Sequence, residues 1–483
     1  MDYMGYTPEP WAKKWLEEQR AKGEKCLEVK ISNGNHYVYR STSRYDPDTK
    51  GPRKVSEYVG VLDPDKGFIE KTKDARKRER IVSIKETGPM RLLDGCCGGL
   101  LGVLKRRFPD NYDQLYSLAM IRSIDRTPLK RASSYWDKFE NIRHLRPAMS
   151  PKSLAEMLRD VGSDREAQDL VFRDLDMNCR ELAVDLTEFF SASGNISFAE
   201  DGYNADHDHL PQINIAMVCT QESGIPVMMR MIPGSVRDIK TVCSTIKEMG
   251  RKDVIIVADR GFYSDENINA LDSNGMDFVM PVKRNSLIYG QGKVNEYDFF
   301  EYRGRLIRFG KYRYDKHWAY RFKDETMSLG EEHHTFMRYK EGYLTKEEVE
   351  EKKKKMGQIV IVSNMDMSPE DVYLIFKRRD SIEKRFRTFK SVLDADSTYL
   401  QDNTAAFGHV FVTFLSMYMI ANLEDRIRTA GLISKMSVED VLMEYSKAYA
   451  VELESGTVDY EIPKKLEDLD AKLGMNIFPI LRS

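Results

Sequence analysis

Acidic side chains appear at two places in the sequence where they could hold a metal or transfer a proton. Asp185 interrupts the apolar segment "ELAVDLTEFF" (181–190), and Asp259 follows the apolar run in "VIIVADRGFYS" (254–264). Carboxyl ends of adjacent strands meet at one edge of an open α/β sheet, where such proteins bind ligands. Two carboxylates there repel each other unless a cation neutralises them or one takes up a proton. Mg²⁺ is the natural candidate, because it prefers oxygen ligands.

A third acid, Glu383, lies in a long predicted helix that begins at Ser368-Pro369. At about 100° per residue, four residues of this helix fall within about 60° of one another, at the margin of an apolar stripe that should dock on the sheet. These four are Phe376, Arg379, Glu383 and Lys390. Residues 377–390 contain seven Lys or Arg and two acids, a net charge of +5. A phosphodiester held around a metal explains one acid among so many cations, and a solvated helix face does not.

Structural interpretations stand beside these chemical ones. Asp259 alone would be read as a turn residue, and Arg260 either contacts the substrate or only steadies the turn. His207 and His209 fit a polar loop better than a zinc site. His409, in an apolar segment, is expected to be a hydrogen-bonded core histidine.

The composition is that of a folded protein with several domains. A length of 483 residues predicts two to four domains. The net charge is -2, so any basic surface must be local, and the six cysteines form no CxxC pair and read as reduced cytosolic thiols. The N-terminus lacks the apolar segment of a signal peptide. Residues 404–423 are apolar and long enough to span a membrane, but their polar residues and isolation predict a buried helix of a soluble protein.

The first part of the chain reads as a small module followed by a basic linker. Residues 1–65 contain a charged helix, a hairpin that turns at Asn33-Gly34, and a third strand. Three tyrosines of this module either stack on bases or, by default, pack the hairpin. They are Tyr37, Tyr39 and Tyr58. Residues 71–80 carry six Lys or Arg against two acids, which is typical of a solvated linker.

Residues 66–178 are predicted to be a basic linker and a helical region. Its short helices, with basic residues between them, suit a DNA-binding domain but also suit any other helical domain. Thr127-Pro128 and Ser150-Pro151 each place a capping residue before a proline at the first helical position. Gly162 reads as a helix stop before a capping box formed by Ser163 and Glu166. An amphipathic helix is predicted for "DQLYSLAMIRSI".

From residue 179 the pattern changes to strands in the order β, β, β, α, β, α, β, which predicts a mixed sheet covered by helices. Ser264 is the predicted cap of the second of these helices. Residues 179–284 are expected to form the first half of a core. An antiparallel, β-rich insertion follows at 285–356, and the second half of the core at 357–430. Residues 431–483 are predicted to be a helical tail.

Several of these segments resemble the insertion-sequence transposases of the DDE type that carry the Y-R-E-K signature. That signature places an aromatic residue, then Arg, Glu and Lys at the spacing of the four helix residues above, with phenylalanine here in place of tyrosine. "VDLTEFF" and "DRGFYS" are similar to the segments around the first and second Asp of the family. "GYNADHDHLPQIN" and "FGHVFVTFLSMYM" resemble two further segments. The resemblance covers about residues 180–425.

The resemblance implies an α/β fold: a ribonuclease-H-like mixed sheet with flanking helices, interrupted by the β-rich insertion and preceded by the N-terminal β module and the helical region. It implies that Asp185, Asp259 and Glu383 hold two Mg²⁺ ions about 4 Å apart, with Mn²⁺ able to substitute. Water would attack first and free the 3′-OH of the transposon end, and that hydroxyl would attack target DNA. Five residues would contact DNA: Phe376, Arg379, Lys390, Arg260 and Lys283.

The implied partners are the double-stranded DNA of the terminal inverted repeats and of the target. A homodimer on paired ends, no membrane, and a cytoplasmic, nucleoid-associated location are expected. The alternative is a catalytically inactive, transposase-derived protein that binds DNA sequence-specifically, and the intact acidic triad favours the enzyme. A nuclease or resolvase without strand transfer fits less well, because of the basic insertion and the end-binding signature.

Overall fold

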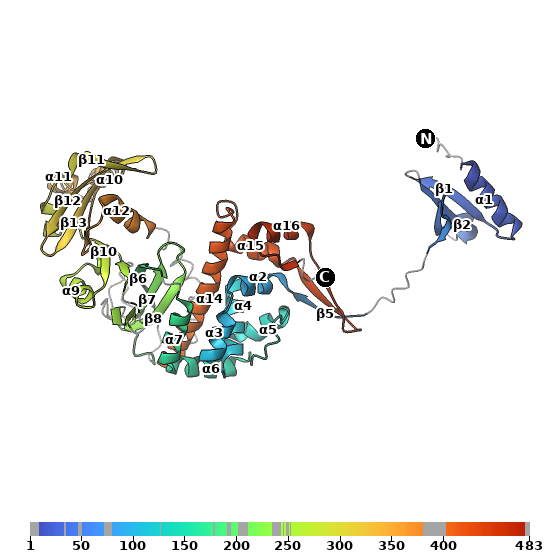
Figure 1. The fold of residues 1–483 in the computed structure, drawn as a ribbon, viewed down its shortest axis with the longest axis horizontal. Coiled ribbons are helices and arrows are strands. Elements are labelled where there is room, and N and C mark those ends of the chain that lie inside the picture. Colours follow the sequence, from blue (N-terminus) through green and yellow to red (C-terminus); the bar gives the residue numbers. More distant parts are fainter. Residues whose placement is uncertain are drawn as a thin grey trace. The chain divides into compact units, whose positions relative to one another are not determined.

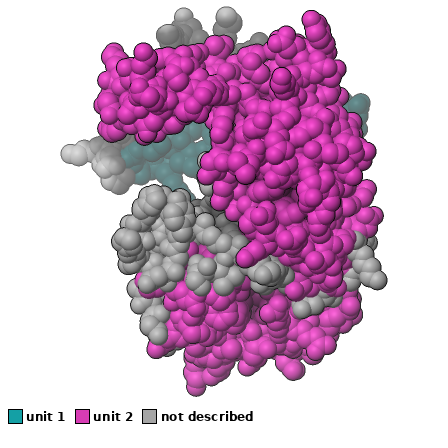
Figure 2. All heavy atoms as spheres, turned by 90° about the vertical axis from the view of Figure 1, so that its left-hand side faces the viewer, with its two compact units in different colours: residues 1–80 teal, residues 81–483 magenta. Residues whose placement is uncertain are grey.

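The computed structural model describes most of the chain in two compact units, which are Met1–Arg80 and Ile81–Ser483 (Figures 1 and 2). The described residues are 9–32, 35–46, 51–71, 80–125, 127–176, 179–190 (backbone only for 186–190), 195–200, 211–233, 243–244, 246–247, 251, 253–379 and 402–478. Glu383, Lys390, His207 and His209 lie outside them, as do Asn33-Gly34 and most of the basic run at 71–80.

The first unit is a four-stranded antiparallel sheet with one helix against it. Its elements are α1 (Pro10–Ala21), β1 (Leu27–Ser32), β2 (Asn35–Asp46), β3 (Gly51–Asp63) and β4 (Gly67–Glu70), and the strands pair in that order. Ser32 pairs with Asn35, so the β1–β2 connection has the two-residue length that the sequence predicts. Ala12, Leu16 and Val38 are buried in a core that belongs to this unit alone. Residues 67–70, placed in the linker by the sequence, complete this sheet because they pair with the end of β3.

The second unit is built around a nine-stranded mixed sheet. Its order is β11-β12-β13-β14-β10-β9-β6-β7-β8. The strands are β6 (Glu181–Phe190), β7 (Gln212–Thr220), β8 (Pro226–Pro233), β9 (Ile255–Val257), β10 (Asp277–Pro281), β11 (Asn295–Tyr302), β12 (Arg305–Tyr314), β13 (His317–Asp324) and β14 (Gln358–Ser363). β6, β7 and β8 form an antiparallel meander, β9 pairs parallel with both β6 and β10, and β14 joins β10 antiparallel. The predicted mixed α/β architecture is confirmed.

Four α-helices belong to the second half of this sheet. They are α9 (Asp265–Ser273), α10 (Glu325–Lys340), α11 (Lys346–Lys353) and α12 (Pro369–Arg378). The predicted caps at Ser264 and Ser368 are confirmed, since each hydroxyl accepts a bond from a backbone N–H three residues later, at 3.2 and 3.1 Å. The sequence pattern missed α10 in the β-rich insertion. It begins at Asp324, whose carboxylate accepts a bond from the Met327 N–H at 3.1 Å.

A helical layer and a small sheet complete the unit. The helices are α2 (Gly88–Cys96), α3 (Leu100–Arg107), α4 (Tyr112–Ile124), α5 (Ala132–Lys138), α6 (Pro151–Ser163), α7 (Arg165–Leu175), α14 (Asn403–Thr429), α15 (Val438–Tyr445) and α16 (Lys464–Leu473). The strands are β5 (Ile81–Glu86), β15 (Tyr449–Leu453) and β16 (Val458–Glu461), in the order β16-β15-β5. The expected helical tail at 431–483 is therefore wrong in part, because two of its segments pair with each other and one of them, β15, also pairs with β5, which is distant in sequence.

Three local predictions for the helical region are wrong. Thr127-Pro128 precedes a short 3₁₀ turn rather than an α-helix, and Thr127 is buried. The cap of α7 is Asp164, which accepts from the Ala167 N–H at 2.9 Å, and Ser163 ends α6. Helix α4 is not amphipathic, because its residues from Leu115 to Ser123 are all buried. The predicted cap at Ser150 is confirmed, with the Ser153 N–H donating to its hydroxyl at 3.1 Å.

Helix α14 is the buried helix that the sequence predicted at 404–423. It is long and apolar enough to cross a membrane, and 78% of its most apolar window is buried inside the protein. Its His409 is a core histidine as expected: the ring is 1% exposed, and its Nδ1 lies 3.3 Å from the Arg122 guanidinium. Burial and the charge of Arg122 lower the pKa of His409 well below its usual value, so the ring is neutral and Nδ1 accepts the bond.

Helices α6 and α14 approach so closely that only glycine fits at their contact. A Cβ on Gly162 would lie 1.8 Å from the carbonyl oxygen of Thr404, and one on Gly408 would lie 1.9 Å from the carbonyl oxygen of Leu158. Gly162 is therefore a packing residue inside α6, and the predicted helix stop is wrong. Because the obstructing atoms are backbone, a side chain can be accepted only if the two helices separate.

Gly408→Ala should lower the free energy of unfolding by about 1–3 kcal/mol or more, because about 1–3 kcal/mol is the usual cost of overpacking. The matched control is Gly102→Ala in α3, where the added methyl would meet only the tip of the Arg106 side chain, at 3.8 Å. The control should keep or raise stability by up to about 1 kcal/mol, because alanine is the better helix former. Thermal unfolding of the full-length variants measures both changes. Equal stability of the two variants would contradict the close helix contact.

Candidate active site

The predicted acids Asp185 and Asp259 end up level with each other on two neighbouring parallel strands. β6 and β9 pair in the register Glu181 with Ile255, Leu182 with Ile256, and Ala183 with Val257. Asp185 lies two residues beyond the last pair on its strand, and Asp259 two residues beyond it on the other. Because side chains alternate with a period of two, both point to the same face of the sheet as the last pair. The register thus places the two residues at equivalent positions, at the carboxyl-terminal edge of the parallel pair.

The backbone after β9 holds the Asp259 carboxylate in place. Its Oδ1 accepts a hydrogen bond from the Arg260 N–H at 2.6 Å, and its carbonyl oxygen accepts one from the Phe262 N–H at 3.0 Å. These bonds begin the 3₁₀ turn Arg260–Phe262, and the Asn267 side chain fixes its far end by donating to the Phe262 carbonyl at 2.8 Å. The backbone of Arg260 therefore steadies the turn, while its side chain is exposed.

Two members of the predicted helix quartet lie beside Asp259. The Arg379 guanidinium, 12% exposed, is 3.8 Å from the Asp259 Oδ1 and 5.9 Å from the centre of the Phe376 ring. Phe376 is 8% exposed and packs in a core with Val257 of β9 and Tyr373 of α12. Burial of Phe376 favours its packing role, in which the ring supports the arginine.

The end of α12 is tied directly to the core sheet. The Gln221 side-chain amide donates to the Ile375 carbonyl, and the Gln221 N–H donates to the Glu181 carbonyl at 3.0 Å. The Arg378 guanidinium donates to the Glu181 carboxylate at 2.9 Å. The helix that carries Arg379 is thus fixed to β6, the strand that carries Asp185.

Asp259 opens into a cavity of about 340 Å³ that is lined by the ends of β9 and β10 and by residues of α10, β14 and α12. Its lining residues are Asp259, Arg260, Pro281, Val282, Arg284, Tyr289, Met327, Glu331, Gln358, Ile359, Phe376 and Arg379. A larger cavity of about 810 Å³ shares three of them and extends over α10 and α11. The cations of that second cavity are Arg260, Arg284, Arg338, Lys352 and Lys355, against the acids Glu331 and Glu351. A strongly cationic hollow therefore leads to Asp259.

Arg284 is a site residue that the sequence analysis missed by one position. The predicted contact, Lys283, is exposed and lines neither cavity, whereas Arg284 lines both. The Glu331 carboxylate accepts from Arg284 at 2.6 Å and, against the opposing effect of burial, raises the pKa of the guanidinium. Glu331 lies on α10, which was not predicted, so no sequence pattern could bring these two residues together.

The donor chemistry of the two acids fits a hard divalent cation. Carboxylate oxygens are the ligands that Mg²⁺ prefers, and a cation is one of the two ways, besides protonation, to relieve the repulsion between two such groups. Within the described ranges, no group of three or more His, Cys, Asp or Glu is placed to hold a metal. The predicted third ligand, Glu383, lies outside the described residues.

Comparison with known proteins identifies the family. The family described as "Transposase DDE domain" matches residues 178–419, which is half of the chain. A search of the curated proteins gave no match. Among solved structures, the chain is similar to the piggyBac transposase in the cryo-EM structure of its synaptic complex with hairpin DNA. The identity is 12%, the coverage is 77% of this chain and 81% of that chain, and the TM-score is 0.38, a likeness too weak to describe the site.

The matched range begins just before β6 and ends within α14, so it contains both aspartates, the insertion and the Arg379 helix. The chain belongs to the DDE transposase family.

Proposed function

We propose that this protein is a DNA transposase that cleaves transposon ends and joins the freed 3′-OH to target DNA. The observation that carries the proposal is the β6–β9 register, in which Asp185 and Asp259 each lie two residues beyond the same strand pair, and Asp259 lines a cationic cavity. The proposal includes the Y-R-E-K signature on Phe376, Arg379, Glu383 and Lys390. It also includes a ribonuclease-H-like core, which is supported by an antiparallel meander whose first strand pairs parallel with β9.

Asp185, Asp259 and Glu383 would hold divalent ions, Mg²⁺ or in its place Mn²⁺. When bound, two such ions activate the attacking oxygen and stabilise the leaving oxygen of an in-line displacement at phosphorus. The turn at Arg260 orients the Asp259 carboxylate by its backbone N–H, and Arg379 adds a positive charge 3.8 Å from that carboxylate. The same residues serve both reactions, because each exchanges one oxygen for another at a phosphodiester.

In the first reaction, water attacks the phosphate at the transposon end and the 3′ oxygen leaves, taking up a proton to become a hydroxyl. In the second reaction, that hydroxyl attacks a target phosphate, loses its proton and displaces a target 3′ oxygen. Arg260, Arg284 and Arg379 line the approach to Asp259 and would hold DNA phosphates by charge-assisted hydrogen bonds. Terminal-repeat and target duplexes are the proposed substrates, bound by a homodimer on paired ends in the cytoplasm, at the nucleoid.

Removing any one acid should abolish cleavage while preserving DNA binding. Asp185→Asn, Asp259→Asn and Glu383→Gln should each lose strand cleavage of DNA that carries the element's terminal repeats, in Mg²⁺ or Mn²⁺. The matched control is Asp253→Asn near the opposite end of β9. The Asp253 carboxylate is 80% exposed and pairs with Arg180 at 3.0 Å. The control should cleave like the parent protein. Full cleavage by Asp259→Asn would refute the assignment, and binding without cleavage by the parent protein would favour a catalytically inactive DNA-binding protein.

Chelation should stop the reaction reversibly. EDTA is expected to abolish cleavage and leave binding measurable, and added Mn²⁺ should restore cleavage. Binding in EDTA should weaken steeply with salt, because each phosphate contact releases counterions. Cleavage that persists in EDTA would contradict a metal role for the acids.

Arg379 and its neighbour Arg378 allow a second matched comparison. Arg379→Ala should lower the cleavage rate by about 10²-fold or more, the usual loss when a charged donor is removed from a phosphoryl site. Arg378→Ala removes the same charge, but its guanidinium is 51% exposed and pairs with Glu181. The Gln221 bond to Ile375 still holds the end of α12, so the rate should fall much less than in Arg379→Ala. Single-turnover kinetics on a terminal-repeat duplex separates the two, and equal losses would show that the pair acts only through net charge.

A further inference from the structure

The two long strands of the first unit extend beyond the rest of its sheet as a two-stranded ribbon. β1 pairs with β2 only up to Arg40, and β4 pairs with β3 only from Gly60 onward. Residues 41–46 and 51–56, called the ribbon below, pair with each other, Ser41 with Ser56 through Asp46 with Gly51. Among the described residues they have no other strand beside them. Six residues of strand span about 20 Å.

Two arginines face each other across this ribbon. Arg44 pairs directly with Arg53 in the β2–β3 register, so both side chains project from the same face. Both residues are exposed, and the Arg53 guanidinium is 75% exposed and lies 3.7 Å from the Asp46 carboxylate. Like charges at directly opposed positions destabilise a sheet. A pair of exposed arginines at this position is therefore suited to an anion that spans both.

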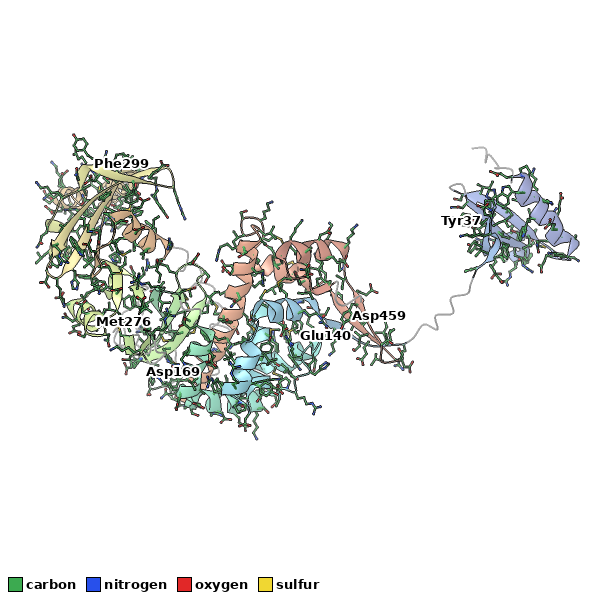
Figure 3. All side chains as sticks on the ribbon, in the orientation of Figure 1. Tyr37, Glu140, Asp169, Met276, Phe299 and Asp459 are labelled. Carbon is green, nitrogen blue, oxygen red and sulfur yellow. The ribbon has the colours of Figure 1, made fainter. Side chains whose placement is uncertain are left out.

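The other face of the same strands is already occupied by its own contacts. Tyr58 lies between Tyr37 and Tyr39, with ring centres 6.0 and 5.6 Å apart, and all three are half-buried. Figure 3 shows Tyr37 on the side of the sheet away from α1. The tyrosines thus pack against one another on the sheet, as the default interpretation of the sequence had it.

Ion pairs hold the polar part of that tyrosine face. Glu28 accepts from Lys54 at 2.5 Å and from Ser41 at 2.6 Å, and Lys30 lies 3.1 Å away. Although burial opposes the shift, these hydrogen bonds lower the pKa of Glu28 to about 2. The Lys54 charge is therefore balanced within the module, whereas Arg44 and Arg53 project from the opposite face of the ribbon.

We propose that the ribbon is a second DNA-binding element, which enters the major groove of double-stranded DNA with Arg44 and Arg53 on phosphates or base edges. The major groove of B-DNA admits a two-stranded β-ribbon. Ser43 and Thr42 add hydroxyl groups that can bond to phosphates and bases. The basic segment 71–80 follows directly in the sequence with a net charge of +4. The inference names a binding element outside the DDE domain and rests on the proposed function only for the identity of the duplex.

The test measures binding of the full-length protein in EDTA, so that no cleavage occurs, to a 30-base-pair terminal-repeat duplex. Arg44→Ala/Arg53→Ala should weaken binding by at least about 10-fold and reduce the salt slope by about 1.8, the value for two lost phosphate contacts. The matched control is Lys13→Ala/Lys14→Ala, which removes two exposed charges from α1 of the same unit. The control should bind like the parent protein.

Thermal unfolding shows whether the double variant is folded, and its stability should be kept or raised because a like-charge pair has been removed. Unchanged affinity and salt slope in the folded variant would overturn the proposal. A second result would also overturn the proposal. The protein would bind single-stranded DNA more tightly than the duplex, Tyr37→Ala/Tyr39→Ala would lose this preference, and Arg44→Ala/Arg53→Ala would keep it. Because the measurement excludes catalysis, an active Asp259→Asn enzyme would refute the proposed chemistry and leave this result standing.

Discussion

The parallel pairing of β6 with β9 is the constraint on which the candidate site depends. Two strands that are distant in sequence must keep one register for Asp185 and Asp259 to stand level. A shift of one residue would turn one side chain to the opposite face. The strands are fully buried around that pair, with Val184 and Ala258 essentially inaccessible, so a slip would place a charge in the core. The apolar residues of the two strands thus fix the register that places Asp185 and Asp259.

Other elements pack on both sides of the paired strands β6 and β9 and fix their position in the sheet. On the β8 side, α14 packs against the sheet and crosses α6 at the contact of Gly162 and Gly408. On the β10 side, β14 links the core to the antiparallel strands of the insertion, and α12 packs on β10 and β12. The insertion strands and the core strands thus form one continuous sheet. Through this sheet the cationic residues of α10 and α11 are held in the cavity that leads to Asp259.

Much of this arrangement follows from local sequence signals. Apolar runs predicted β6 and β9, and serine caps predicted the starts of α6, α9 and α12, because each depends on residues a few positions apart. Pairings between distant segments, such as β5 with β15, leave no local signal. The Ser163 cap failed because Asp164, one residue later, supplies a better acceptor. The position of Arg284, next to the predicted Lys283, in the wall of both cavities follows only from the fold.

A metal held by the two level aspartates can be located chemically. Fe²⁺ in place of Mg²⁺, with ascorbate and oxygen, generates hydroxyl radicals that cut the polypeptide close to the bound ion. In the full-length protein, mass spectrometry of the fragments should find cuts near residues 185 and 259. Excess Mg²⁺ should suppress these cuts, and Asp259→Asn should remove both sets together. Cuts confined to other segments, or cuts at 185 that survive Asp259→Asn unchanged, would show that the two carboxylates do not share a metal.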